Sequence, residues 1–132
     1  MGASNAEVAR RAFAEFGRPL EESEAWDPDV TIVNAAGWVI EAEYHGHEGV
    51  RRWWADLDDA FVDFGLELDE VIELDEERVL TTQRMVGHFR ATGIPTDAQW
   101  ASILTVRDGR VVRAEGYLSK RRAMRAAGLS EG

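Results

Sequence analysis

Residues 97–119 read DAQWASILTVRDGRVVRAEGYLS, two runs of alternating residues around the dipeptide Asp108-Gly109. Asp-Gly is typical of a tight type I′ turn, because both central residues of that turn need positive φ. Each run places apolar side chains on one face, so the stretch predicts a long β-hairpin. The residues expected to face inward are Trp100, Ser102, Leu104 and Val106 on the first strand, and Val112, Ala114, Gly116 and Leu118 on the second.

Two more β-type runs precede this hairpin, at residues 66–74 and 78–91. The four runs follow one another with short connections, which predicts an antiparallel meander. A looser hairpin is expected earlier in the chain, from residues 29–34 and 38–44. One sheet therefore dominates the predicted structure.

Helical periodicity and capping signals mark the remaining segments. Ser4 and Glu7 have the spacing of a capping box, which begins a helix. A wide apolar stripe that includes Trp53 and Trp54 predicts the main packing helix. The expected helices cover residues 5–16, 20–26 and 48–62, with a last one between the Ser119 cap and Gly128.

These elements predict a single α+β domain over residues 1–132. We expect a cone-shaped, curved antiparallel sheet with helices packed on one face. A strongly curved sheet leaves a hollow between itself and its helices, so the fold should enclose a pocket for a small molecule.

Composition excludes several classes of protein. The formal net charge of −10 argues against nucleic-acid binding, since the one basic cluster is a short run near the C-terminus, interpreted as the solvated end of the last helix. No apolar stretch is long enough to span a membrane, and no cysteine is present to form disulfides or bind zinc. We therefore expect a cytoplasmic protein that binds neither nucleic acid nor membrane.

Several short motifs resemble those of SnoaL-like proteins in the nuclear transport factor 2-like superfamily. They occur in the family's order over nearly the whole chain. The motifs are Trp26-Asp27-Pro28-Asp29-Val30, Tyr44-His45-Gly46-His47-Glu48-Gly49-Val50-Arg51, Thr105-Val106-Arg107-Asp108-Gly109-Arg110-Val111-Val112, Tyr117 and Ala126-Ala127-Gly128-Leu129. The resemblance implies the cone fold, which hosts isomerases, cyclases, hydrolases and non-catalytic binding modules.

Matched residue by residue, this resemblance leaves the activity open. Asn34 stands where ketosteroid isomerase-like members place a proton-shuttling aspartate, and an amide cannot shuttle that proton. It also coincides with a water-positioning asparagine of limonene epoxide hydrolase-like members, whose catalytic arginine matches Arg84. The two aspartates of that group fall on Val86 and Gly116, and its tyrosine falls on Ile32. The R-D-Y stretch of SnoaL proteins reads Glu115-Gly116-Tyr117 here.

His88 and Arg84 are the candidate catalytic residues. If Arg84 faces the hollow, as the matched position does, strand periodicity places His88 on the same face. His88 would then be a general acid or base, and Arg84 would bind an anionic or oxyanionic group. The opposite face of this strand, with Gln83 and Met85, is no more polar, so alternation alone cannot choose between the two faces. A structural role for His88 stays open.

The candidate ligand-binding residues are aromatic or neutral polar side chains expected near the pocket. They are Asn34, Trp38, Tyr44, Trp54, Trp100, Ser102 and Leu118. His45 and His47 bracket a glycine turn rather than share a helix face, so no metal site is expected there. The chain also lacks a phosphate-binding glycine loop, and we expect no cofactor.

The sequence thus supports two functional hypotheses. The first is a pocket protein for a small, largely apolar molecule, with isomerase, cyclase or hydrolase activity as a further step. The second is a non-catalytic ligand-binding or dimerisation module. A homodimer is expected through an apolar outer sheet face, formed by Gln83, Met85, Phe89, Ala101, Ile103 and Tyr117.

Overall fold

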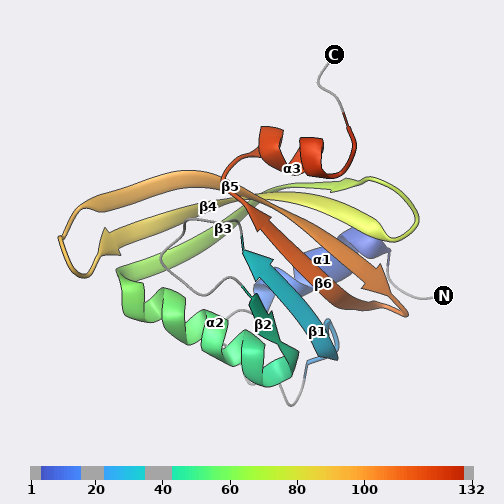
Figure 1. Ribbon diagram of the computed structural model, residues 1–132, viewed down its shortest axis with the longest axis horizontal. Helices are drawn as coiled ribbons and strands as arrows, with labels where there is room; N and C mark the ends of the chain where they lie inside the picture. Colours follow the sequence, from blue (N-terminus) through green and yellow to red (C-terminus); the bar gives the residue numbers. More distant parts are fainter. Residues whose placement is uncertain (1–3, 16–22, 35–42, 130–132) are drawn as a thin grey trace.

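The computed structural model describes residues 4–15, 23–34 and 43–129, which contain three helices and six strands (Figure 1). In chain order the elements are α1 (Asn5–Ala14), β1 (Trp26–Asn34), β2 (Glu43–His45), α2 (Gly46–Ala60), β3 (Phe61–Glu73), β4 (Arg78–Phe89), β5 (Pro95–Arg107), β6 (Arg110–Tyr117) and α3 (Lys120–Ala126). Two predicted caps are confirmed, because the Ser4 Oγ accepts from the Glu7 N–H and the Ser119 Oγ from the Arg122 N–H.

The strands form one sheet in the order β2-β1-β6-β5-β4-β3. Strands β3 to β6 pair antiparallel in chain order, so the predicted meander is confirmed. In the β5–β6 turn, Asp108 and Gly109 have φ angles of 52° and 74°, as a type I′ turn requires. β1 pairs with β6 in parallel, a long-range pairing that local alternation does not reveal.

The helices lie on both sides of this curved sheet. α1 and α2 cover what we call the inner face, and α3 lies on the outer face (Figure 1). Consecutive residues of β4 show the division, since Val79 belongs to the inner core and Leu80 packs in the cluster around Ala123 of α3. The predicted cone-shaped α+β fold is confirmed, with the difference that its last helix covers the outer face.

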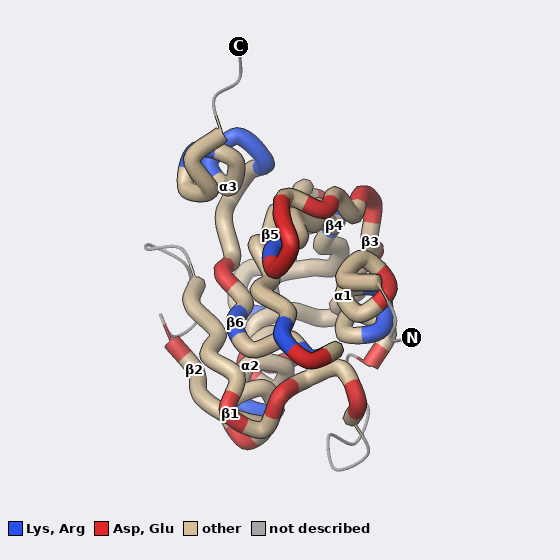
Figure 2. Tube along the Cα trace, turned by 90° about the vertical axis from the view of Figure 1, so that its right-hand side faces the viewer, with Lys and Arg blue, Asp and Glu red and all other residues tan. Residues whose placement is uncertain are grey.

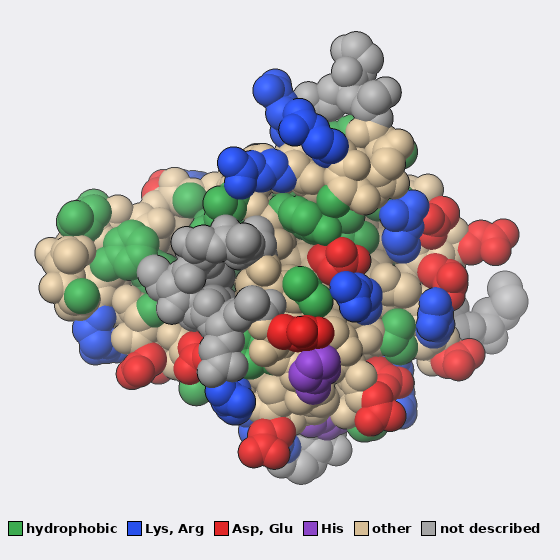
Figure 3. All heavy atoms as spheres, in the orientation of Figure 1, with side chains coloured by type: hydrophobic (Ala, Val, Ile, Leu, Met, Phe, Trp, Pro, Cys, Tyr) green, Lys and Arg blue, Asp and Glu red, His purple; other side chains and the backbone are tan. Residues whose placement is uncertain are grey.

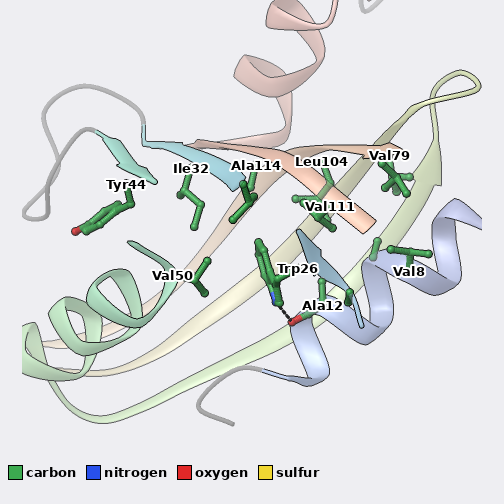
Figure 4. Close-up of a cluster of buried hydrophobic side chains, with 14 of the residues drawn as sticks. Val8, Ala12, Trp26, Ile32, Tyr44, Val50, Val79, Leu104, Val111 and Ala114 are labelled. Carbon is green, nitrogen blue, oxygen red and sulfur yellow. Dashed lines mark hydrogen bonds between the residues drawn. The ribbon is translucent and has the colours of Figure 1, made fainter. Parts of the chain in front are cut away.

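Trp26 lies at the centre of the inner core (Figure 4). Its side chain is 2% exposed, and its Nε1 donates to the Ala12 carbonyl at 3.1 Å. Its ring meets those of Trp53 and Trp54 edge-on, at centroid distances of 6.2 and 6.5 Å. One side chain therefore joins α1, β1 and α2.

The position of Trp26 corrects one prediction. The helix expected over residues 20–26 does not reach Trp26, which begins β1 instead, while residues 20–22 lie outside the described part of the chain. The Val111 N–H donates to the Ala25 carbonyl at 2.7 Å, which ties this segment to β6. Pairing with the sheet and burial of the indole outweigh local helix propensity here.

Two bulges interrupt the pairing of β3 with β4 and bend this strand. Its register with β4 shifts between Val62 and Gly65, and again between Leu68 and Glu70. Opposite the first bulge lies Gly87, whose φ is 148°. A Cβ atom at Gly87 would lie 3.0 Å from the Val62 carbonyl oxygen, so the close approach of the two strands requires glycine.

Charge is unevenly distributed over this fold. Lys and Arg side chains gather on α3, whereas acidic side chains are spread over the strands and their turns (Figure 2). In the space-filling view the basic side chains of α3 project beyond a surface of mixed sign (Figure 3). Among the helices described, none has both the length and the apolar character needed to cross a bilayer.

The turn between β3 and β4 gives a pH-dependent prediction. The Asp75 carboxylate accepts from the N–H groups of Glu77 and Arg78 and from the Arg78 guanidinium. The Glu77 N–H first, and Arg78 next, lower the pKa of Asp75 from 3.8 to about 2. Because the folded pKa is depressed, this stabilisation is complete above the unfolded pKa of 3.8 and is lost as the pH falls through about 2.

We therefore expect Asp75→Asn to be less stable than the wild type at neutral pH, by an amount that shrinks on acidification. Urea unfolding of both proteins across the acidic range measures the difference. A stability gap that stays constant down to the lowest pH would contradict this account of the turn.

Candidate functional site

A narrow cavity of about 40 Å³ lies between the inner face of the sheet and the helices. Three neutral polar side chains are part of its wall, and most of the rest is apolar. The lining residues are Phe13, Asn34, Trp53, Leu57, Leu66, Gln83, Met85, Trp100, Ala101, Ser102 and Gly116. None of these described lining residues carries a titratable side chain, so they offer binding groups but no acid or base.

The register of β4 decides which of its side chains reach the cavity. Gln83 pairs with Trp100 of β5 and Met85 with Leu66 of β3, and all four line the cavity. Arg84 and His88 do not line it, which corrects the orientation expected for this strand. The physical reason is that Val79 is buried in the inner core, so the alternate residues Thr81, Gln83 and Met85 follow it inward.

Arg84 is exposed on the outer face, where its guanidinium binds Asp97 through two hydrogen bonds. The Asp97 hydrogen bond raises the pKa of Arg84, and Arg84 in turn lowers the pKa of Asp97. The side chains are 47% and 56% exposed, so solvent screens the pair and it contributes little stability. His88 is also exposed. The structure thus separates both candidate catalytic residues from the cavity.

The candidate ligand-binding residues divide into groups. Asn34, Trp100 and Ser102 line the cavity, and Gly116, which was expected to face inward, lines it as well. Tyr44 and Trp54 are buried in the inner core and do not line it. Leu118 is 36% exposed and also lies outside the lining, whereas Trp38 falls outside the described residues.

Tyr44 has a well-defined role away from the cavity. Its hydroxyl donates to the Asp56 carboxylate at 2.6 Å, and the Arg52 guanidinium lies 5.9 Å from its ring centroid. The ring is 2% exposed. These contacts join β2 to α2.

Three residues form a polar chain across the inner face of β4 and β5. The Thr81 hydroxyl donates to the Gln83 Oε1 at 3.0 Å, and the Gln83 Nε2 donates to the Ser102 Oγ at 2.8 Å. All three side chains are buried, and the last two reach the cavity. Sequence reasoning selected Ser102 but not Gln83. The sequence pointed to Gln83 only through its place on the face of the strand opposite Arg84 and His88.

The two histidines near α2 make local contacts. The His47 Nε2 donates to the Trp26 carbonyl at 2.7 Å, while His45 lies near Thr31 and Glu43. In the described part of the chain no three His, Asp or Glu side chains gather as metal ligands. The hydrogen bond from His47 to the Trp26 carbonyl links the start of α2 to β1.

A cavity on the inner face of a bent sheet, covered by two helices, is the architecture that the motifs implied. A family model described as the SnoaL-like domain matches residues 6–114. The chain belongs to the SnoaL-like family. No curated protein sequence matches it.

Solved structures agree with this SnoaL-like assignment at the level of the fold. A nuclear transport factor 2-like protein from Burkholderia thailandensis superposes with a TM-score of 0.78 at 18% identity, covering 97% of this chain and 99% of that one. A protein of ketosteroid isomerase-like fold from Catenulispora acidiphila, solved with trimethylamine, gives 0.72 at 19% identity and covers 97% and 96%. TerC, co-crystallised with polyporic acid, gives 0.74 at 22% identity and covers 89% and 92%.

Proposed function

We propose that this SnoaL-like protein binds a small, neutral, largely apolar molecule in the cavity beneath β4 and β5. The observation that carries the proposal is the composition of the wall. Aromatic and aliphatic side chains surround a few convergent polar groups, Asn34, Gln83 and Ser102, which is the usual composition of a small-molecule site. Two structural neighbours were solved with small organic molecules, which supports a pocket function.

The residues that line the cavity favour binding without catalysis. General acid–base catalysis needs a titratable group within hydrogen-bond reach of the reacting atom. The two candidates, His88 and Arg84, are exposed away from the cavity. Turnover assays on each bound compound test this point, since conversion of a ligand would favour the enzymatic alternative.

The cavity is too small to hold an organic ligand unless its wall changes on binding. A volume of about 40 Å³ holds a few water molecules, given that one water needs about 10–15 Å³. A larger ligand must displace part of the wall, in which Trp53 and Trp100 are the largest side chains. We therefore expect ligand binding to change the intrinsic tryptophan fluorescence.

Gly116→Ala is expected to weaken ligand binding without lowering the stability of the fold. A Cβ atom at this position would lie 3.4 Å from the Asn34 Oδ1, an ordinary contact, so the fold should accept it. Alanine should leave stability unchanged or raise it by about 0.4–1 kcal/mol, because it restricts the unfolded chain. Its methyl group would occupy the cavity and weaken the binding of apolar compounds. Thermal unfolding and fluorescence titration with indane measure the two effects.

Arg113→Ala is the matched control, because Arg113 lies on the same strand with an exposed side chain. It should leave indane binding unchanged. If Gly116→Ala binds indane as tightly as the wild type, the ligand does not occupy this cavity and the proposal fails.

Homodimerisation stays a prediction, but not through the face first expected. Gln83 and Met85 point inward to the cavity, and Ile103 is buried in the cluster that contains Ala123 of α3. Light scattering at tens of micromolar measures the oligomeric state directly.

A further inference from the structure

We propose that the polar group of the bound molecule is a hydrogen-bond acceptor, of which a ketone carbonyl is the simplest form, and that the Ser102 hydroxyl donates to it. This inference rests on the proposed function and deepens it, because it names the chemical class of the ligand. It follows from the direction of the hydrogen bonds in the Thr81–Gln83–Ser102 chain.

The chain begins at Thr81, which is 0% exposed. Its hydroxyl donates to the Gln83 Oε1, so the amide oxygen of Gln83 faces Thr81. The amide nitrogen must then face the other way. It donates to the Ser102 Oγ across the β4–β5 pair.

Ser102 is the last member and its side chain reaches the cavity. A serine hydroxyl has one hydrogen to donate and two lone pairs. One lone pair accepts from Gln83. Among the described residues, no acceptor takes a hydrogen bond from the Ser102 hydroxyl. That hydrogen is available to an acceptor in the cavity. The Thr81–Gln83 and Gln83–Ser102 hydrogen bonds thus orient the amide so that Ser102 is the donor toward the ligand.

Charge narrows the ligand class further. Neither a cationic nor an anionic side chain is among the described residues that line the cavity. A carboxylate or an ammonium group would lose its hydration there without a counter-ion among these residues. A neutral carbonyl does not have this difficulty.

The test uses one carbon skeleton with different polar groups: indan-1-one, indane, indan-1-ol, 1-aminoindane and indane-1-carboxylate. Affinities are measured by tryptophan fluorescence with the full chain. We expect indan-1-one to bind about tenfold more tightly than indane, the gain that one buried hydrogen bond can provide. The alcohol, which can also accept, should fall between them, and the two ions should bind more weakly than indane.

Two variants test the direction of the chain. Ser102→Ala removes the donor, so indan-1-one should lose its advantage over indane. Gln83→Glu replaces the amide donor by an acceptor of nearly the same shape. At mildly alkaline pH its carboxylate should accept the Ser102 hydrogen, leave a lone pair facing the cavity and reverse the preference toward 1-aminoindane. Arg84→Gln, on the outer face of the same strand, is the control and should change none of these ratios.

The outcomes distinguish this inference from the proposed function. If no compound binds, indane included, the proposed function fails. If indane and indan-1-one bind equally, the pocket stands and the acceptor inference is overturned. Preference of the wild type for 1-aminoindane would also overturn it, since the Gln83 amide would then be reversed. Should Gln83→Glu fail to fold, Ser102→Ala alone decides, because an undiminished ketone preference in that variant contradicts the proposal.

Discussion

Replacing Trp26 by alanine is expected to lower the free energy of unfolding by about 3–5 kcal/mol, the largest effect of any substitution considered. The indole is 2% exposed, packs edge-on against Trp53 and Trp54, and donates to the Ala12 carbonyl. Alanine would leave a cavity where α1, β1 and α2 meet, and the Ala12 carbonyl would lose its side-chain donor. Urea unfolding followed by circular dichroism measures the loss.

Trp100→Ala is the control for this experiment. Trp100 is only partly buried and faces the cavity, so its truncation removes fewer packed contacts. It should therefore cost less than Trp26→Ala. Equal losses in the two variants would show that Trp26 is not the centre of the core.

Gly87→Ala should be the second most damaging change, with an expected cost of about 2–3 kcal/mol. Its φ of 148° is a conformation that residues with a side chain rarely adopt. The added Cβ would also lie 3.0 Å from the Val62 carbonyl oxygen and 3.3 Å from that of Asp63. Both atoms are backbone atoms of the β3 bulge, so the strand must shift to make room.

Gly116→Ala provides a matched comparison, since the chemical change is identical. Gly116 has no strained φ, and its nearest neighbour is a side-chain atom at 3.4 Å. Thermal unfolding should thus show a lower melting temperature for Gly87→Ala and an unchanged or higher one for Gly116→Ala. If Gly87→Ala is as stable as the wild type, the bulge is not held by the close approach of β3 and β4.

The sequence predicted the helix caps and the tight turn correctly, because each is encoded by neighbouring residues. The Ser4 and Ser119 caps and the Asp108-Gly109 turn each depend on residues within a few positions of one another. The signal at Trp26 was local too, but misleading. An indole before Asp27-Pro28 fits the end of a helix, and only contacts with Ala12 and with β6 place it in a strand.

The candidate site could be predicted only in part. Ser102, Trp100 and Asn34 were found because alternation on the last strands, or the family resemblance, pointed to them, and all three line the cavity. Gln83 and Met85 were not selected, because both faces of β4 carry a similar mixture of polar and apolar residues. Matching Arg84 to a family position chose the face that the structure turns outward.

The sequence by itself determined the α+β class, the meander with its tight turn, the helix caps and the SnoaL-like family, because each depends on spacing along the chain. The tertiary structure alone decided the parallel pairing of β1 with β6, the position of α3 and the face of β4 that lines the cavity. The physical reason is that a strand with two similar faces takes its orientation from its neighbours. Burial of Val79 in the inner core and of Leu80 beneath α3 fixes that orientation and brings Gln83 to Ser102.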